Sequence, residues 1–460
     1  MKKIRLFTAI LTAKLTIKIL RILKRGGTTL PGKIAMKLCP DILNKIAGSF
    51  KVIMVTGTNG KTTTTRIIAQ MLKQSGTEFI TNKSGANLVS GIITTFIENV
   101  SLTGHSKYST ALLEIDEAAF RKVSLSIEPD ILVVTNFFRD QLDRYGELYT
   151  TLKGVKSGIS NFKNTKLVLN ADDSLCASLA HDVDKETVYY GISSEAYNAP
   201  DEIYNSDAVF CIHCKTKYEY SSRVYGHLGW FSCPNCGYRR PATQITCTSI
   251  EELSDSYSIL TLDISGKAYK AKVNLPGLYN IYNSLAAAAC GYLLNLSNEV
   301  IIDAIGSFEC GFGRMESIDA GNKAIKLILV KNPTGFDQVI SYLKTIKKPS
   351  VFAFIINDKL ADGTDISWLW DVEFEKLSKM DNILYFFTSG IRAEDMAVRL
   401  KYASVDTELI VIEKDYDKLI ERALEKTPEG SSLYILPTYT AMLEIRKTLS
   451  NRFALKEFWK

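Results

Sequence analysis

One stretch of this sequence has the composition and the setting of a loop that holds nucleotide phosphates. An apolar run at 51–55 precedes it, and a segment with helical periodicity at 62–74 follows it. Glycines let backbone amides face phosphate oxygens, the helix N-terminus adds positive potential, and a lysine neutralises the terminal phosphates. The strict pattern has Gly in place of Val55, yet strand, loop and helix coincide, which predicts a nucleotide site. Its residues are Thr56, Gly57, Thr58, Asn59, Gly60, Lys61, Thr62 and Thr63, with Lys61 on the terminal phosphates and the Thr62 hydroxyl on Mg²⁺.

Four of the nine cysteines form two close pairs, each with two residues between its members and with 18 residues between the pairs. This spacing is typical of a zinc ribbon, and four thiolates complete a tetrahedral shell, so we predict structural zinc rather than a disulfide framework. His213 and His227 lie nearby and are expected to be ordinary surface or packing residues. The predicted ligands are Cys211, Cys214, Cys233 and Cys236.

A third group of reactive side chains follows the apolar run at 351–356. The loop 357–371 is dense in carboxylates, among them Asp358 and Asp365, and contains two tryptophans. Loops at the carboxyl ends of parallel strands are where α/β domains place their chemistry. The alternative is a solvated acidic turn, since acids are common in turns.

Length and composition indicate an ordinary globular protein of two or three domains. The chain has 460 residues, of which 46% are hydrophobic and 23% charged, and its net charge of +6 is too small to indicate a nucleic-acid binder. Apolar runs at 110–115, 131–135 and 167–170 alternate with helical segments, which predicts an α/β fold with a parallel sheet. We expect a helical leader at 1–45, an ATP-binding domain at 46–319 with an insertion at about 196–248, and a C-terminal α/β domain, Rossmann-like, at 320–460.

The N-terminal segment combines apolar and basic residues. Residues 6–13 follow a basic start as in a signal peptide, but charged residues then recur at helical spacing and leave no run long enough to cross a bilayer. A helix of this kind either lies on an anionic membrane surface or packs against the protein body, and both interpretations stay open. We expect a cytoplasmic protein, with contact to the inner face of the membrane as the open alternative. The interrupting residues are Lys14, Lys18, Arg21 and Arg25.

The string TGTNGKTTT resembles the Mur ligase and folylpolyglutamate synthase superfamily, and further strings follow in that superfamily's order. The resemblance implies that Glu114 reaches Mg²⁺ together with Thr62, that Asn280 contacts the nucleotide and that Arg314 reaches the ATP phosphates. Gln141 stands where the superfamily has a metal-binding His, which puts a second metal site in doubt. The acids at 116 and 117 are interpreted as helix caps rather than as metal ligands. The supporting strings are LEIDE at 113–117, TN at 135–136, DQLD at 140–143, NADD at 170–173, GLYNIYN at 277–283, GRME at 313–316 and KNP at 331–333.

The cysteine insertion and the 357–371 loop narrow the resemblance to the MurT family of ligase subunits. Membership implies ATP, Mg²⁺ and structural Zn²⁺, and ATP-dependent amidation of the D-glutamate α-carboxyl of lipid II to D-isoglutamine through an acyl phosphate. Lys61 and Arg314 would stabilise charge during transfer. The family works as a heterodimer with a GatD-type glutamine amidotransferase, whose Cys–His pair Asp358 would complete, with Asp365 as second choice. This chain has no G-x-C-x-G elbow of its own; Cys310 comes nearest but lacks the first Gly.

Two other functions stay open at this point. The first is a ligase that adds an amino acid, as folylpolyglutamate synthase and standard Mur ligases do. The second is a nucleotide-regulated zinc-ribbon module that binds nucleic acid through basic residues such as Lys215 and Arg239. No aromatic and basic RNA-binding pattern occurs elsewhere, so we expect no nucleic-acid partner.

Overall fold

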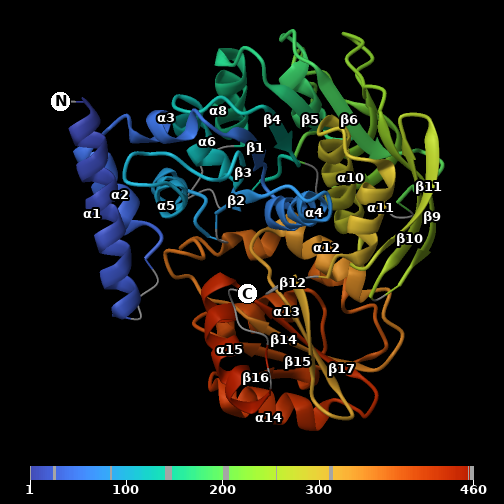
Figure 1. The fold of residues 1–460 in the computed structure, drawn as a ribbon. Helices are drawn as coiled ribbons and strands as arrows, with labels where there is room; N and C mark the ends of the chain where they lie inside the picture. The colour runs from blue at the N-terminus through green and yellow to red at the C-terminus, as the bar shows by residue number, and fades with distance from the viewer. Residues whose placement is uncertain are drawn as a thin grey trace.

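The computed structural model describes residues 2–23, 27–82, 85–139, 148–199, 207–254, 256–309, 314–453 and 455. These residues form a nine-stranded sheet, a six-stranded sheet and a two-stranded hairpin, covered by helices (Figure 1). The predicted α/β class is confirmed, as are the parallel sheets. None of the helices in the described part of the chain has both the length and the apolar content needed to cross a bilayer.

The first sheet has the strand order β11-β10-β9-β6-β5-β4-β1-β3-β2. All neighbours from β2 to β9 pair in parallel, whereas β9, β10 and β11 pair antiparallel. The strands are β1 (Lys51–Thr56), β2 (Phe79–Thr81), β3 (Thr110–Glu114), β4 (Ile131–Val134), β5 (Lys166–Asn170), β6 (Thr187–Ile192), β9 (Ile245–Leu253), β10 (Ser258–Ile264) and β11 (Lys267–Val273).

Helices cover both faces of this sheet, which explains why its central strands are apolar throughout. Along β1, Val52 and Met54 belong to one core cluster and Ile53 and Val55 to the other. The first face carries α1 (Lys2–Ile22), α2 (Leu30–Leu38), α3 (Ile42–Ala47), α5 (Val89–Asn99), α6 (Glu117–Ser124) and α8 (Leu148–Asn161). The second face carries α4 (Lys61–Gln74), α10 (Leu278–Leu293) and α11 (Asn298–Ser307).

The second sheet has the order β12-β13-β17-β14-β15-β16 and is parallel except for the β12–β13 pair. Helices α12 (Pro333–Leu343) and α13 (Ala393–Tyr402) cover one face, and α14 (Tyr416–Lys426) and α15 (Tyr439–Arg452) cover the other. The predicted division at residue 319 stays a prediction; the strand that opens this sheet begins earlier. The strands are β12 (Arg314–Asp319), β13 (Ala324–Ile328), β14 (Ser350–Ile355), β15 (Ile383–Ser389), β16 (Ile410–Ile412) and β17 (Ser432–Pro437).

The cysteine-rich insertion contributes the two-stranded hairpin of β7 (Glu219–Tyr225) and β8 (Leu228–Ser232). It is placed between β6 and β9 in the chain, and β6 pairs directly with β9. The insertion therefore leaves the sheet continuous, as expected of a module added between two neighbouring strands.

Candidate active site

The predicted phosphate loop connects β1 to α4, as its sequence indicates. Gly57 and Gly60 have φ angles of +122° and +84°, a backbone conformation that side chains rarely adopt. A Cβ at Gly60 would lie 2.0 Å from the Asn283 side-chain oxygen, and one at Gly57 would lie 2.3 Å from the Thr135 hydroxyl. Both glycines are therefore required by conformation and by space.

Thr135 and Asn136, at the end of β4, hold this loop in place. The backbone amide of Asn59 donates to the Asn136 side-chain oxygen at 2.9 Å, and the Thr135 hydroxyl donates to the Asn59 carbonyl at 2.7 Å. The amide of Thr58 donates to the Asn136 carbonyl at 2.9 Å. The TN string therefore orders the backbone that would face phosphate. The neighbouring string at 140–143, with the substituted Gln141, lies outside the described residues.

Lys61 is the buried cation of the loop. Its ammonium donates to the carboxylate of Glu117 at 2.7 Å and to the carbonyls of Gly57 and Thr58. Burial lowers the pKa of Lys61, but the carboxylates of Glu117, Asp116 and Glu114 outweigh it and hold that pKa above its ordinary value. Lys61 is therefore charged and surrounded by three acids.

The interpretation of the two acids after Glu114 as helix caps is half right. Asp116 caps α6 by accepting a hydrogen bond from the amide of Ala118 at 3.1 Å. The prediction was wrong for Glu117, whose side chain turns inward to Lys61. No local pattern distinguishes Asp116 from Glu117, because the ion pair between Glu117 and Lys61 joins positions far apart in the sequence.

Glu114 ends β3 and pairs in register with Val55, directly before the loop. Its backbone amide and carbonyl are both bonded to the side chain of Asn82, at 2.8 Å each, and its carboxylate accepts from Asn87 at 3.4 Å. Glu114 thus ends the strand next to β1, and Thr62 lies in the first turn of α4, directly after the loop that follows β1. A carboxylate and a hydroxyl both supply the oxygen ligands that Mg²⁺ prefers. The residues present fit a magnesium ion.

A cavity opens where the two sheet domains meet beside this loop. Asn280, predicted to contact nucleotide, lines it, and its side chain is held by Pro276 and Asn283 at 2.8 and 3.1 Å. The first domain also contributes Asn59, Gly60, Thr63, Asn136, Phe138, Tyr225 and Tyr279, and the second contributes Met315, Ile328, Leu329, Lys331, Thr334, Gly335, Gln338 and Val339.

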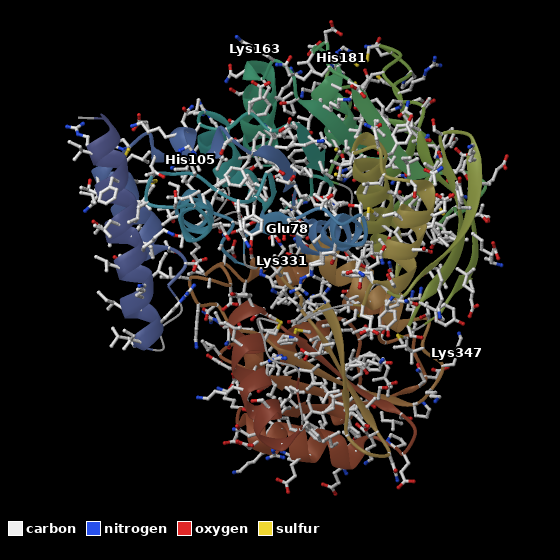
Figure 2. The ribbon with its side chains drawn as sticks, viewed as in Figure 1. Glu78, His105, Lys163, His181, Lys331 and Lys347 are labelled. Carbon is white, nitrogen blue, oxygen red and sulfur yellow. The ribbon has the colours of Figure 1, made fainter. Side chains whose placement is uncertain are left out.

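Two residues of the KNP string tie the second domain to the loop. The Lys331 ammonium donates to the Thr58 carbonyl at 3.3 Å, and the Asn332 amide donates to the Asn59 side-chain oxygen at 3.1 Å. Figure 2 shows Lys331 at the junction between the domains. Both sheets therefore contribute cationic or polar groups to one pocket. Arg314 starts β12, and its side chain lies outside the described residues, so its contact with phosphate stays a prediction.

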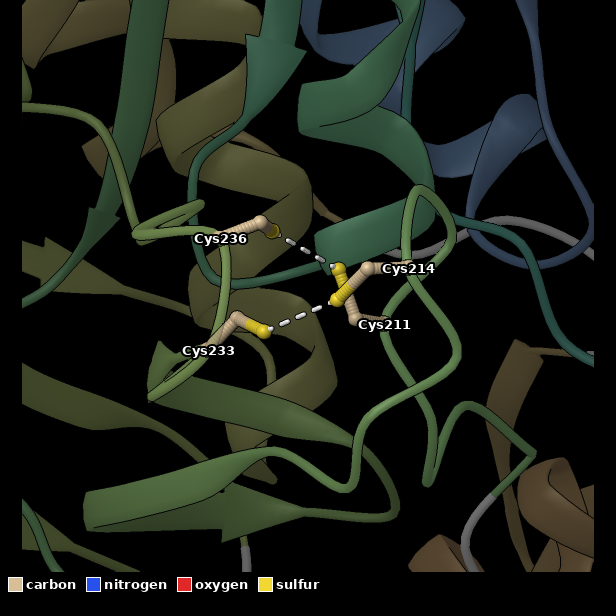
Figure 3. Close-up of side chains that lie close together, drawn as sticks. All are labelled: Cys211, Cys214, Cys233 and Cys236. Carbon is tan, nitrogen blue, oxygen red and sulfur yellow. Dashed lines mark hydrogen bonds between the residues drawn. The ribbon is translucent and has the colours of Figure 1, made fainter.

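The four predicted zinc ligands come together in space. All four sulfur atoms lie within 4.8 Å of one another, with Cys211 and Cys236 at 3.5 Å and Cys214 and Cys233 at 3.4 Å (Figure 3). The side chain of Thr216, whose hydroxyl lies 3.4 Å from the Cys214 sulfur, and the backbone of Thr216 lower the pKa of the Cys214 thiol to about 5, which favours the thiolate that a metal needs. Four sulfurs in this arrangement fit tetrahedral zinc.

The two histidines do not belong to this cysteine cluster. His227 is fully buried at the turn of the β7–β8 hairpin, where it bonds to Asp173 at 3.1 Å and packs on the ring of Phe138 at 4.7 Å. His213 packs on His181 at 4.2 Å. The prediction of packing histidines is confirmed for both.

The hairpin also contributes a pocket residue that sequence analysis missed. Tyr225 lines the cavity beside the phosphate loop and stacks on Phe138, with ring centroids 6.0 Å apart. Phe138 in turn donates its backbone amide to the Thr58 hydroxyl at 3.1 Å. An aromatic residue in a cysteine-rich segment carries no motif, so only the folded hairpin reveals this role.

The two carboxylates of the C-terminal loop have different partners. Asp358 follows β14 and accepts two hydrogen bonds from the guanidinium of Arg392, at 2.6 and 2.9 Å. Asp365 accepts from the backbone amide of Ser367 at 2.8 Å and so caps a short turn. Of the described residues that line the cavity beside the phosphate loop, none comes from 357–371. Asp358 therefore marks a second region of the molecule.

Comparisons with known proteins agree with this arrangement. Residues 55–236 match the Mur ligase middle domain, and residues 329–442 match the MurT ligase C-terminal family. The chain is 36% identical to the MurT subunit of lipid II isoglutaminyl synthase (glutamine-hydrolyzing) from Streptococcus pneumoniae, with 93% of each chain covered. It is 35% identical to the same subunit from Staphylococcus aureus, with 98% of this chain and 99% of that one covered.

Solved structures share the fold at low identity. The pseudomurein peptide ligase type C of Methanothermus fervidus has a TM-score of 0.65 and 23% identity, covering 89% of this chain and 81% of that one. MurF of Acinetobacter baumannii has a TM-score of 0.65 and 14% identity, covering 91% and 80%. Because it aligns with these MurT subunits over nearly its full length at about 35% identity, the chain belongs to the Mur ligase family and, within it, to the MurT subunits of lipid II isoglutaminyl synthase.

Proposed function

We propose that this chain is the ATP-dependent ligase subunit that amidates the D-glutamate α-carboxyl of lipid II to D-isoglutamine. The observation that carries the proposal is the cavity between the domains, where the phosphate loop, Asn280 and Lys331 face one space. Carboxylate activation by ATP needs phosphate contacts and water exclusion rather than an enzyme nucleophile. A cavity closed by a second domain supplies both.

The proposed reaction has two steps. A carboxylate oxygen attacks the terminal phosphorus of ATP, and the bond to ADP breaks, which leaves an acyl phosphate. Ammonia then attacks the carbonyl carbon, the bond to phosphate breaks, and one nitrogen proton ends on the released phosphate. Lys61, with Arg314 from the second domain, would stabilise the charge that develops on the transferred group.

Thr62 and Glu114 would hold Mg²⁺, which when bound would neutralise negative charge on the phosphates. Lys61 already carries a counter-charge from Glu117, so its ammonium would exchange this carboxylate for a phosphate when ATP enters. Thr135 and Asn136 hold the backbone of the phosphate loop in place. This reduces the entropic cost of ordering the loop when ATP binds.

The nitrogen would come from a partner. Free ammonia is scarce at neutral pH, and the relatives are named as subunits of a glutamine-hydrolysing enzyme. We propose a heterodimer with a GatD-type glutaminase, in which Asp358 is the third member of that subunit's Cys–His triad. Asp358 is half-buried, and the neighbouring side chains of Leu360 and Ile391 are exposed and apolar, as a docking face requires.

The cysteine cluster is proposed as a structural zinc site, because all four positions of a tetrahedral shell are taken by sulfur. Reduced thiols of this kind persist in a reducing cytoplasm, which is the location we propose. The chain is also 24% identical to UDP-N-acetylmuramate–L-alanine ligase of Caldicellulosiruptor saccharolyticus, which would favour a reaction that adds an amino acid. The MurT match is longer and closer, and it favours amidation.

The test is ATP-dependent amidation of lipid II by the purified chain, with ammonium chloride or glutamine as nitrogen source, with and without the co-expressed glutaminase. Product is expected from ammonium with the chain alone, and from glutamine only with the partner. Addition of an amino acid instead of ammonia, or ATP turnover that no nitrogen source changes, would contradict the proposal.

A further inference from the structure

Helix α1 is apolar on two opposite faces. Ala9, Ile10, Ala13 and Ile17 form the inner face and are buried in the first core cluster, against α2 and α5. In Figure 1 this helix forms the outer edge of the molecule. Its inner face therefore accounts for its attachment to the protein, and its outer face needs a separate explanation.

The outer face carries an apolar stripe that Lys18 interrupts. Its residues recur at intervals of three and four, so they share one side of the helix over a length of about 30 Å. Their side chains are between 37% and 80% exposed. An ordinary surface helix has polar residues there. We call these six residues the outer stripe: Ile4, Phe7, Leu11, Leu15, Ile19 and Ile22.

The threonine hydroxyls beside the outer stripe are bonded to the backbone of their own helix. The hydroxyls of Thr8, Thr12 and Thr16 each donate to a carbonyl one turn earlier in the same helix, at 2.8 to 3.0 Å. Each threonine hydroxyl is thus satisfied without water. The outer side of α1 can enter an apolar medium without leaving these groups unbonded.

The charge around the outer stripe has one sign. The first 40 residues contain ten lysines and arginines and no aspartate or glutamate. Lys14 and Lys18 lie within or beside the stripe, and Arg21 is bonded to Glu98 of α5 at 2.7 Å, which fastens the helix to the protein. A second copy of this helix would bring like charges together, whereas an anionic lipid surface complements them.

We propose that α1 lies in the headgroup region of an anionic membrane, parallel to its plane, with the outer stripe among the acyl chains. The helix is held to the protein by its inner face while it does so. An apolar face with flanking cations is the composition of interfacial helices. This inference rests on α1 alone and is independent of the reaction proposed above.

The test is flotation of the full-length chain with vesicles of phosphatidylcholine, alone or with about one third phosphatidylglycerol. The variant Leu11→Glu/Leu15→Glu breaks the outer stripe, and Lys14→Gln/Lys18→Gln removes charge. The matched control is Leu125→Glu/Ile412→Glu, which adds the same charges at exposed apolar positions outside α1. Circular dichroism checks that each variant is folded.

The wild type and the control should float with anionic vesicles, and the stripe variant should bind at least about tenfold more weakly. The lysine variant should bind more weakly to anionic vesicles than the wild type does, and its binding should depend less on salt concentration. Equal binding by the wild type and the stripe variant would overturn the proposal, as would no binding by the wild type. Concentration-dependent dimerisation that the stripe variant abolishes, without vesicle binding, would also overturn it and assign the stripe to a second copy.

Discussion

The ammonium of Lys61 lies 2.7 Å from the carboxylate of Glu117, and the two side chains are only 9% and 3% exposed. The buried lysine of the predicted phosphate loop is thus neutralised by a carboxylate of the same chain. Because the pKa of Lys61 is raised from 10.5, the pair contributes to stability below that pH and loses its contribution only as the pH rises through the raised value. Lys61 therefore stays charged and paired with Glu117 throughout the neutral pH range.

Glu117→Gln is expected to lower the free energy of unfolding by about 3–5 kcal/mol, because it leaves a buried cation without its counter-charge. Saturating Mg-ATP should recover much of this loss, since phosphate then pairs with Lys61. Urea unfolding with and without nucleotide measures both effects. The exposed pair of Lys156 and Asp182 supplies the control: Asp182→Asn should leave the urea midpoint unchanged. A Glu117→Gln protein as stable as the wild type without ATP would show that Lys61 is not buried as a charge.

Asp358→Asn should abolish amidation from glutamine, by a factor on the order of 10⁴, while amidation from ammonium continues. The reason is that Asp358 is proposed to act in the partner's site and lies outside the nucleotide cavity. Asp365→Asn is the matched variant, because its carboxylate caps a turn, and it should retain both activities. Parallel assays with the two nitrogen sources decide between them. Loss of ammonium-dependent product in Asp358→Asn would place this residue in the ligase reaction instead.

Cys214→Ser should release zinc and lower the melting temperature, since three thiolates do not close the tetrahedral shell. Metal analysis of the purified chain is expected to give one zinc per wild-type molecule and much less in the variant. Cys247→Ala serves as the control, because this buried cysteine lies outside the cluster and its loss should leave zinc in place. Equal zinc in both variants would mean that the metal is held elsewhere.

Tyr225→Ala should weaken ATP binding by roughly five- to tenfold, because an aromatic wall of the cavity and its contact with Phe138 are lost at a cost of about 1 kcal/mol. Tyr225→Phe retains the ring and should bind as the wild type does. Calorimetric titration with a non-hydrolysable ATP analogue measures this. Chelation of zinc should also weaken ATP binding, because Tyr225 belongs to the cysteine-rich hairpin. Unchanged affinity in Tyr225→Ala would separate the hairpin from the nucleotide site.

Short-range features were predictable because local physics determines them. The order of strand, glycine loop and helix at 51–74 specifies a phosphate-binding turn wherever it occurs, and two close cysteine pairs specify a four-sulfur cluster. The central strands were recognisable as apolar runs, because both faces of the sheet are covered. The prediction that Glu117 caps a helix was wrong, because only the folded surroundings of Asp116 and Glu117 distinguish these two neighbouring acids.

By itself the sequence determined the α/β class, the glycine-rich loop between strand and helix, the four-cysteine cluster and the family to which the chain belongs, since each depends on residues close together or on the order of motifs. Only the tertiary structure decided that Glu117 pairs with Lys61, that Tyr225 reaches the cavity between the domains from the cysteine-rich hairpin, and that Asp358 binds Arg392 while Asp365 caps a turn. These contacts join segments that are distant along the chain, and the packing of sheets and helices, rather than local spacing, sets the distances between them.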